Sequence, residues 1–208
     1  DLSVRKSVMN KELLGRLPIE EYVQSRYEKT ISEVPALEGE NPVEARRREI
    51  GYLNLRWFMT TLLDRKDRTT MASGLEVRVP FADHRLVQYV YNVPWEYKCH
   101  NNVVKGLLRD SAAGLLPNEV LYRKKSPYPK TYHPQYEFLL KQKLTEVLED
   151  DTSRIQPLVD REMLYKWMQH PSDYGRPWFG QLMAVPQMYA YLLQMEAWLR
   201  TYNIILEI

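Results

Sequence analysis

The chain has 208 residues, of which 44% are hydrophobic and 27% charged, and its 29 Lys and Arg against 27 Asp and Glu give a net charge of +2. This composition is typical of a soluble globular domain, and the near balance of charge gives no argument for a nucleic-acid or membrane-surface partner. No run of about 18 apolar residues is present, so no membrane-spanning helix is predicted. The single cysteine, Cys99, excludes a disulfide within the chain and favours a reducing cytoplasm. Its neighbour His100 does not by itself supply a catalytic geometry, so we expect a non-catalytic thiol.

The first strong helix signal begins at Asn41, which can cap a helix, with Pro42 at the first helical position and Glu44 three residues after the cap. Apolar residues then recur at helical spacing on two adjacent stripes: Ile50, Leu53 and Trp57 on one, and Tyr52, Leu55, Met59 and Leu63 on the other. We predict a helix from about Val43 to about Asp64. Because so much of its surface is apolar, we expect it to be buried.

Further helices are predicted by the same periodicity, and most are bounded by cap or proline signals. The first of these helices starts at Asp83 and ends before Val93-Pro94, and the next covers Val103–Ala113 and ends at Gly114. The others cover Gln135–Glu149, Arg161–His170 and Phe179–Tyr202, and the last of them is kinked or broken at Pro186. Strand signals are weak, with Glu76–Val79 and Ile204–Ile208 as the best candidates. The proline-rich segment Tyr122–Pro134 is predicted to be a loop, and an acidic joint is expected near residues 149–153. The predicted fold class is mainly α.

Two groups of charged residues stand out between these helices. The first contains Asp67, Arg68, Glu76 and Arg78, of which Glu76 and Arg78 share one face if the segment is extended and are followed at once by apolar residues. The second is basic and contains Lys105, Arg109, Arg123, Lys124 and Lys125. Lys105 and Arg109 are four residues apart on the predicted helix and would project together, toward a triphosphate or pyrophosphate. A solvated charged surface is the alternative interpretation of both groups.

Three long segments closely resemble the asparagine synthetase family in its bacterial form: DRKDRTTMASGLEVRVPFADHRLVQYV, KGLLRDSAAGLLPNEVLYRKKSPYPKTYHPQY and PWFGQLMAVPQMYAYLLQMEAWLR. The resemblance extends from about Glu20 to Ile205. It implies that residues 1–208 are the C-terminal, helical part of an α/β synthetase domain of the adenine-nucleotide alpha-hydrolase-like (ATP-pyrophosphatase) fold.

The resemblance also implies a reaction, in which aspartate and ATP form an aspartyl adenylate and pyrophosphate, and ammonia released from glutamine then attacks the activated carboxyl group. ATP and Mg²⁺ would serve the whole enzyme, in a cytoplasmic setting. Lys125 matches a lysine that contacts the phosphates, where it would offset charge on the leaving pyrophosphate. Glu76 and Arg78 match a Glu-x-Arg-x-Pro-Phe pattern and would form a wall of the site, paired with Lys105 or Arg109.

The remaining members of the two groups are expected to bind substrate under the same resemblance. Asp67 and Arg68 match the pattern ahead of Glu76 and would face the substrate pocket, while Lys105, Arg109 and Arg123 would line its basic side. The family's Ser-Gly-Gly-x-Asp-Ser loop, its Ser-Gly-Glu-Gly-x-Asp-Glu segment and its N-terminal nucleophilic cysteine do not occur in the sequence. We therefore expect a fragment that is inactive alone, with no adenine or metal site, whose missing N-terminal half is its natural partner.

Exposed apolar surface is expected where that half would pack, on one stripe of the Val43–Asp64 helix and at Val77, Val79 and Phe81, and these residues could support a homodimer. Two alternatives stay open. One is a related enzyme that activates another carboxylate, such as a β-lactam synthetase-like cyclase or a peptide-amidating enzyme, although the RKKSPYPKT segment argues for the asparagine branch. The other is a free-standing helical interaction module.

Overall fold

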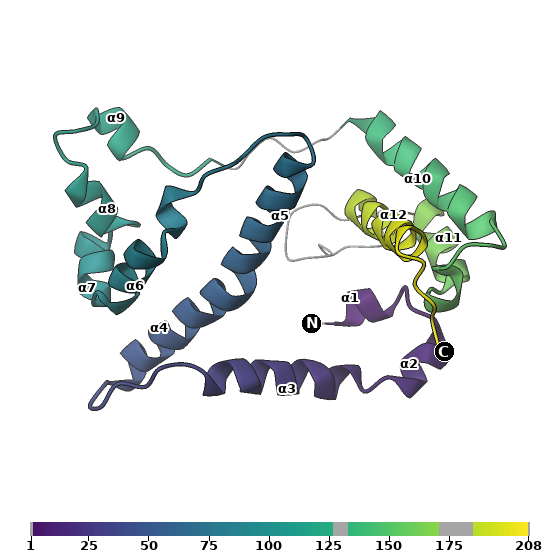
Figure 1. The fold of residues 1–208 in the computed structure, drawn as a ribbon, viewed down its shortest axis with the longest axis horizontal. Helices are drawn as coiled ribbons and strands as arrows, with labels where there is room; N and C mark the ends of the chain where they lie inside the picture. Colours follow the sequence, from purple (N-terminus) through teal and green to yellow (C-terminus); the bar gives the residue numbers. More distant parts are fainter. Residues whose placement is uncertain (1, 127–132, 171–184, 208) are drawn as a thin grey trace. The chain divides into compact units, whose positions relative to one another are not determined.

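The computed structural model describes residues 2–126, 133–170 and 185–207, and these residues form helices joined by turns and loops, without a β-strand (Figure 1). The mainly α prediction is confirmed for this part of the chain. The predicted strands at Glu76–Val79 and Ile204–Ile208 are not formed by the residues described there, and an isolated antiparallel bridge joins Met9 to Val159. The chain divides into two compact units, residues 20–126 and residues 1–19 with 127–208, which are described separately below.

The terminal unit contains the first two helices and the last three, together with one short 3-10 turn. Its elements are α1 (Ser3–Lys6), α2 (Lys11–Arg16), α10 (Pro134–Glu149), η4 (Gln156–Leu158), α11 (Arg161–Gln169) and α12 (Val185–Thr201). The predicted helices Gln135–Glu149 and Arg161–His170 agree with α10 and α11 to within one residue. The predicted start of the last helix at Phe179 lies outside the described residues, and Pro186 is the second residue of the described part of α12.

The terminal unit has a well-packed apolar core. Residues from α10, α11 and α12 meet in it, and the fully buried members include Leu144, Leu148, Leu164, Met188, Tyr189 and Leu199. The N-terminal segment is tied to the same core through Val8, whose carbonyl accepts a hydrogen bond from the Asp160 N–H at 2.8 Å. Near residues 149–153, where an acidic joint is expected, Asp150 and Ser153 are hydrogen bonded to side chains of α12.

The central unit contains a long continuous helical rod, residues 42–71, which is followed by short helices (Figure 1). Its elements are α3 (Ile19–Ser32, from Glu20 onward), α4 (Pro42–Leu53), the π-helical segment η1 (Asn54–Met59), α5 (Thr60–Met71), η2 (Pro80–Ala82), α6 (His84–Asn92), α7 (Trp95–Lys98), the 3-10 turn η3 (His100–Asn102), α8 (Gly106–Ser111) and α9 (Asn118–Leu121). Both predicted caps are confirmed, since Asn41 Oδ1 accepts from the N–H groups of Val43 and Glu44, and Asp83 Oδ1 accepts from that of Arg85.

The expectation that the Val43–Asp64 helix is buried is wrong for this chain. Helical structure continues without interruption through η1 and α5 to Met71, and none of its residues is buried. Ile50 and Trp57 are each 47% exposed. A helix buries its apolar face only against a second layer, and the described residues of this unit bury only Thr30, Gly106 and Leu121. The exposure predicted for one apolar stripe of this helix, which includes Ile50 and Trp57, and for Val77, Val79 and Phe81 is confirmed.

The helix predicted over Val103–Ala113 is shorter in the structure, where α8 begins at Gly106 and ends at Ser111. Its first turn is not helical because Lys105 has a φ value of 60°, in the left-handed region, as do Asn101 and Asn102 just before it, with φ values of 55° and 59°. Gly114, with φ of 78°, lies just beyond the helix as predicted. Lys105 is therefore the cap residue before α8, and the expectation that it projects from one helix together with Arg109 is wrong.

Gly106 fills a position where a larger residue should not fit. A Cβ atom there would lie 2.7 Å from the backbone nitrogen of His100 and 3.1 Å from its carbonyl oxygen. Gly106→Ala should therefore lower the free energy of unfolding by about 1–3 kcal/mol, because the clash is with backbone that cannot rotate away. Urea denaturation followed by tryptophan fluorescence measures this change.

Gly15→Ala is the matched control for this substitution. A methyl group at Gly15, inside α2, meets nothing within 4 Å. It should leave stability unchanged or raise it by about 0.5–1 kcal/mol, because alanine loses less backbone entropy than glycine in a helix. A Gly106→Ala chain as stable as the unsubstituted one would contradict the close approach.

Candidate functional site

The residues predicted to carry chemistry all lie in the central unit. Asp67 and Arg68 are on α5, Glu76 and Arg78 follow it in an irregular segment, Lys105 precedes α8, Arg109 is within α8, and Arg123 and Lys125 follow α9. Every one of them except the half-buried Arg109 is exposed. The site residues are thus mostly exposed surface groups, and the contacts that hold each one determine what it can bind.

Glu76 and Arg78 form an ion pair with each other. Arg78 Nε donates to Glu76 Oε1 at 3.0 Å, with 84% of the arginine side chain and 67% of the glutamate side chain exposed. The expected shared face is confirmed. Glu76 is engaged with Arg78, so the expected partnership of this pair with Lys105 or Arg109 is not what this contact shows. At this exposure, the pair contributes little to stability.

On α5, Arg68 Nε donates to Asp64 Oδ1 at 2.7 Å, one helical turn away, so its guanidinium pairs with Asp64. Asp67 occupies an exposed position on the same helix. A pair four residues apart supports an isolated, solvated helix by a few tenths of a kcal/mol, about 0.2–0.5. This pairing is consistent with the extension of the helix to Met71, over residues where no apolar periodicity predicts a helix.

Lys125 lies four residues beyond the end of α9. The segment that carries it starts from a stem, the C-terminal end of α9, that is held in place. Leu121, the last residue of α9, is 7% exposed, whereas Arg123, Lys124 and Lys125 are exposed. Among the described residues, no hydrogen bond or ion pair engages the Lys125 ammonium group. The arrangement presents a flexible point charge from a fixed base, which suits contact with phosphate oxygens.

Arg109 provides much of that anchor. Its Nη1 donates to the Leu121 carbonyl, its Nε donates to the Val104 carbonyl at 2.8 Å, and its guanidinium carbon lies 5.8 Å from the centre of the Tyr122 ring. Sequence reasoning expected Arg109 at the substrate and missed Leu121 and Tyr122. The signal that could have found them is the pairing of an arginine with an aromatic residue directly after a short helix.

The central unit also contains a cluster of charged residues that was not predicted. Arg48 donates to both carboxylate oxygens of Glu40 at 2.9–3.2 Å, with each side chain only 11–12% exposed, and its guanidinium lies 5.5 Å from the Tyr91 ring centre. The hydrogen bonds that Arg48 donates to Glu40 raise the pKa of Arg48. Lys98 Nζ donates to the Tyr91 carbonyl at 3.1 Å, and burial lowers the pKa of this lysine. The cluster joins α4 to α6 and α7.

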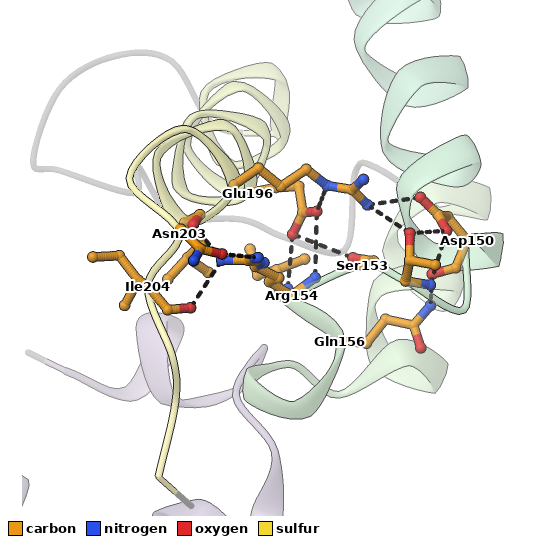
Figure 2. A network of polar contacts seen from close by, with 11 residues as sticks. Asp150, Ser153, Arg154, Gln156, Glu196, Asn203 and Ile204 are labelled. Carbon is orange, nitrogen blue, oxygen red and sulfur yellow. Dashed lines mark hydrogen bonds and ion pairs between the residues drawn. The ribbon is translucent and has the colours of Figure 1, made fainter.

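The terminal unit holds a polar network around one buried carboxylate, Glu196, which is 4% exposed (Figure 2). Its oxygens accept hydrogen bonds from Ser153 Oγ at 3.3 Å, the Arg154 N–H at 3.3 Å, the Ile155 N–H at 2.8 Å and Arg200 Nε. Burial opposes ionisation, but these bonds outweigh it and hold the pKa of Glu196 below its ordinary value.

Two further side chains extend this network around the C-terminal end of α12. Arg154 donates to the Leu199 carbonyl at 2.9 Å, the Ile204 carbonyl at 3.1 Å and Asn203 Oδ1 at 2.6 Å, which closes the C-terminus of the helix. Asp150 accepts from the side chain and backbone of Thr152 and from Arg200, and these bonds lower its pKa to about 2. The network fixes α12 against the turn after α10 and is structural.

The described residues do not supply a metal site. No group of three or more His, Cys, Asp or Glu side chains among residues 2–126, 133–170 and 185–207 is placed to hold an ion. No helix in the same ranges is long and apolar enough to cross a membrane. The basic residues around Lys125 have the chemistry to meet the phosphates of a nucleotide, and no step below is assigned to a metal held by this chain.

Comparison with known proteins identifies the family. The asparagine synthase family matches residues 2–200, so the chain belongs to this family. It is 50% identical over 190 residues to asparagine synthetase [glutamine-hydrolyzing] 3 of Bacillus subtilis (strain 168), a match that covers 91% of this chain and 31% of that protein. The resemblance inferred from the three sequence segments is confirmed.

Two other relatives match shorter stretches. Asparagine synthetase [glutamine-hydrolyzing] 1 of Bacillus subtilis (strain 168) is 41% identical over 73 residues, which is 35% of this chain and 12% of that protein. The asparagine synthetase [glutamine-hydrolyzing] of Gallus gallus is 48% identical over 67 residues, 31% of this chain and 12% of that protein. The chain thus spans less than a third of the length of the relatives it matches.

Proposed function

We propose that this chain is the helical part of the synthetase domain of a glutamine-dependent asparagine synthetase. In that reaction a carboxylate oxygen of aspartate attacks the α-phosphorus of ATP, pyrophosphate leaves, and ammonia from glutamine then displaces AMP from the aspartyl adenylate. The observation that carries the proposal is the anchored, exposed Lys125 segment in a chain matched to the family over residues 2–200.

Lys125 is the residue to which we assign a part in the chemistry. As pyrophosphate departs, negative charge grows on its bridging oxygen, and an ammonium group nearby stabilises that charge more in the transition state than in the ground state. Its four-carbon stem lets the charge follow the oxygens as the bond breaks. Its exposed position in the segment after α9 supports this role.

The other charged residues are assigned to substrate binding. Arg123 and Lys105 would add positive charge near the phosphates, while Asp67 and Arg68, together with the Glu76–Arg78 pair, would form the wall toward aspartate. Their exposure leaves them accessible to a ligand. Arg109 differs from these residues, because its guanidinium is engaged with two backbone carbonyls and an aromatic ring.

The test is aspartate-dependent exchange of labelled pyrophosphate into ATP, which reports formation of the adenylate without any need for ammonia. The complete protein encoded by the gene should show exchange. The 208-residue chain should show none, because the Ser-Gly-Gly-x-Asp-Ser and Ser-Gly-Glu-Gly-x-Asp-Glu segments do not occur in it.

Other carboxylates provide the specificity control in the same assay. Exchange that requires a carboxylate other than aspartate would overturn the asparagine assignment in favour of a related carboxylate-activating enzyme. Exchange by the pure 208-residue chain would overturn the proposal that this chain is only one part of the synthetase.

A further inference from the structure

We propose that Arg109 is a positioning residue that holds the stem of the Lys125 segment in place, and that it acts on adenylate formation through Lys125 without touching the substrate. The inference rests on the proposed function of Lys125. Neither the membership of Arg109 in the basic group nor the family match gives it this role. The contacts that carry it lie within the central unit, where α8 and α9 are neighbours (Figure 1).

The stem is the C-terminal end of α9, a helix of four residues (Asn118–Leu121). The last carbonyl groups of a helix have no partner within it, and a positive charge there is favourable. Arg109 Nη1 meets this need at the carbonyl of Leu121, the one residue of α9 whose side chain is buried. The point where the chain leaves α9 is therefore held by its side chain and by its backbone.

The guanidinium group makes three contacts that fix its own orientation. Nε donates to the Val104 carbonyl at 2.8 Å, Nη1 donates to the Leu121 carbonyl, and the guanidinium carbon lies 5.8 Å from the Tyr122 ring centre. A planar fork with five donors can serve two carbonyls and an aromatic face together, whereas an ammonium group is a compact point charge. The geometry thus depends on arginine specifically.

The helix that carries Arg109 is itself fixed. Asp110 Oδ2 lies 2.9 Å from His100 Nδ1, and Gly106 packs directly against the His100 backbone. The arginine is thus anchored at its base as well as at its tip. The hydrogen bond that Arg109 donates to the Leu121 carbonyl therefore links α8 to the start of the Lys125 segment.

Lys125 lies four residues beyond Leu121, so an extended segment places it at most about 14 Å from the stem. Release of the stem would shift the segment's origin and widen the range over which the ammonium group moves. A misplacement of about 1 Å can reduce a reaction rate by about 100-fold. We therefore expect Arg109→Gln to lower the maximal exchange rate of the complete protein by about 10-fold to 100-fold. The KM for aspartate should change much less.

A double-mutant cycle separates this role from general structural damage. The complete protein is prepared as Arg109→Gln, Lys125→Gln and the combined variant, and aspartate-dependent pyrophosphate exchange is measured for each. If Arg109 acts through Lys125, its substitution should change the rate less than about twofold once Lys125 is already Gln. Multiplication of the two single losses would overturn the proposal.

Three more variants complete the test. Arg109→Lys should recover only a minor part of the loss, and Tyr122→Leu, which keeps apolar bulk but removes the ring face, should show a smaller loss of the same kind. Arg46→Gln is the matched control, because Arg46 is an exposed arginine of the same unit whose guanidinium pairs on the surface with Glu49. It should exchange at the unsubstituted rate.

The outcomes also distinguish this inference from the proposed function. An unsubstituted protein without aspartate-dependent exchange would defeat the proposed function, and this inference with it. Normal exchange by Arg109→Gln in a protein that Lys125→Gln inactivates would overturn only the inference. If Arg109→Gln does not fold, a normal rate for Tyr122→Leu has the same consequence.

Discussion

Lys125→Ala in the complete protein should lower the rate of aspartate-dependent ATP–pyrophosphate exchange by about 100-fold to 1,000-fold. The ammonium group stabilises charge that develops on the leaving pyrophosphate, and a methyl group cannot replace it. Because that charge is greatest in the transition state, the loss should fall on the maximal rate more than on the KM for ATP or aspartate. Initial-rate exchange at saturating substrates measures the effect.

Lys124→Ala is the matched control for this substitution. Lys124 is the adjacent lysine in the same exposed segment, so its loss removes the same charge from the same surface. A general electrostatic contribution to nucleotide attraction would make the two variants alike, and both losses would then shrink at high salt. A near-normal rate for Lys125→Ala, or equal losses for both variants, would refute the specific role of Lys125.

Local signals in the sequence were enough to predict the helices with clear ends. Caps at Asn41 and Asp83, and the proline after α6, act through neighbouring residues and fixed φ angles, so the structure agrees with them. The end of the long rod was missed by seven residues, from Asp64 to Met71. That last part is polar and solvated, supported by the Arg68–Asp64 pair, and periodicity of apolar residues cannot detect such a helix.

Contacts between distant residues were beyond the reach of sequence reasoning. Glu40 and Arg48 are eight residues apart, with the N-cap Asn41 and the start of α4 between them, and the partners of Glu196 other than Arg200 lie about forty positions away. Lys105 was expected in a helix because the apolar residues around it recur at helical spacing, and only the backbone shows its left-handed conformation. The same limitation hid the contact of Arg109 with Leu121, so sequence reasoning found the charged residues and missed what holds them.

Glu196→Ala should lower the free energy of unfolding by about 3–5 kcal/mol, a large part of a domain's stability. The substitution leaves the Ser153 hydroxyl, two backbone N–H groups and the Arg200 guanidinium without their buried acceptor. Buried donors without partners cost more than the net value of the bonds they had made. Urea denaturation of the 208-residue chain, followed by circular dichroism, measures the change.

Glu146→Ala is the control for this substitution. Glu146 is half exposed and pairs with Lys143 on the surface of the same unit, so its loss should cost less than about 0.5 kcal/mol.

Acid should also lower the stability that the network around Glu196 provides. A carboxyl group whose pKa is lowered by folding contributes stability above its unfolded pKa, 4.5 for Glu196 and 3.8 for Asp150. This stability is lost as the pH falls through the folded value, which is about 2 for Asp150. The unsubstituted chain should therefore lose stability below about pH 4.5, and Glu196→Ala, which has already lost the central acceptor, should lose less over the same range. Equal acid sensitivity of the two chains would show that Glu196 is not the group whose ionisation holds α12 in place.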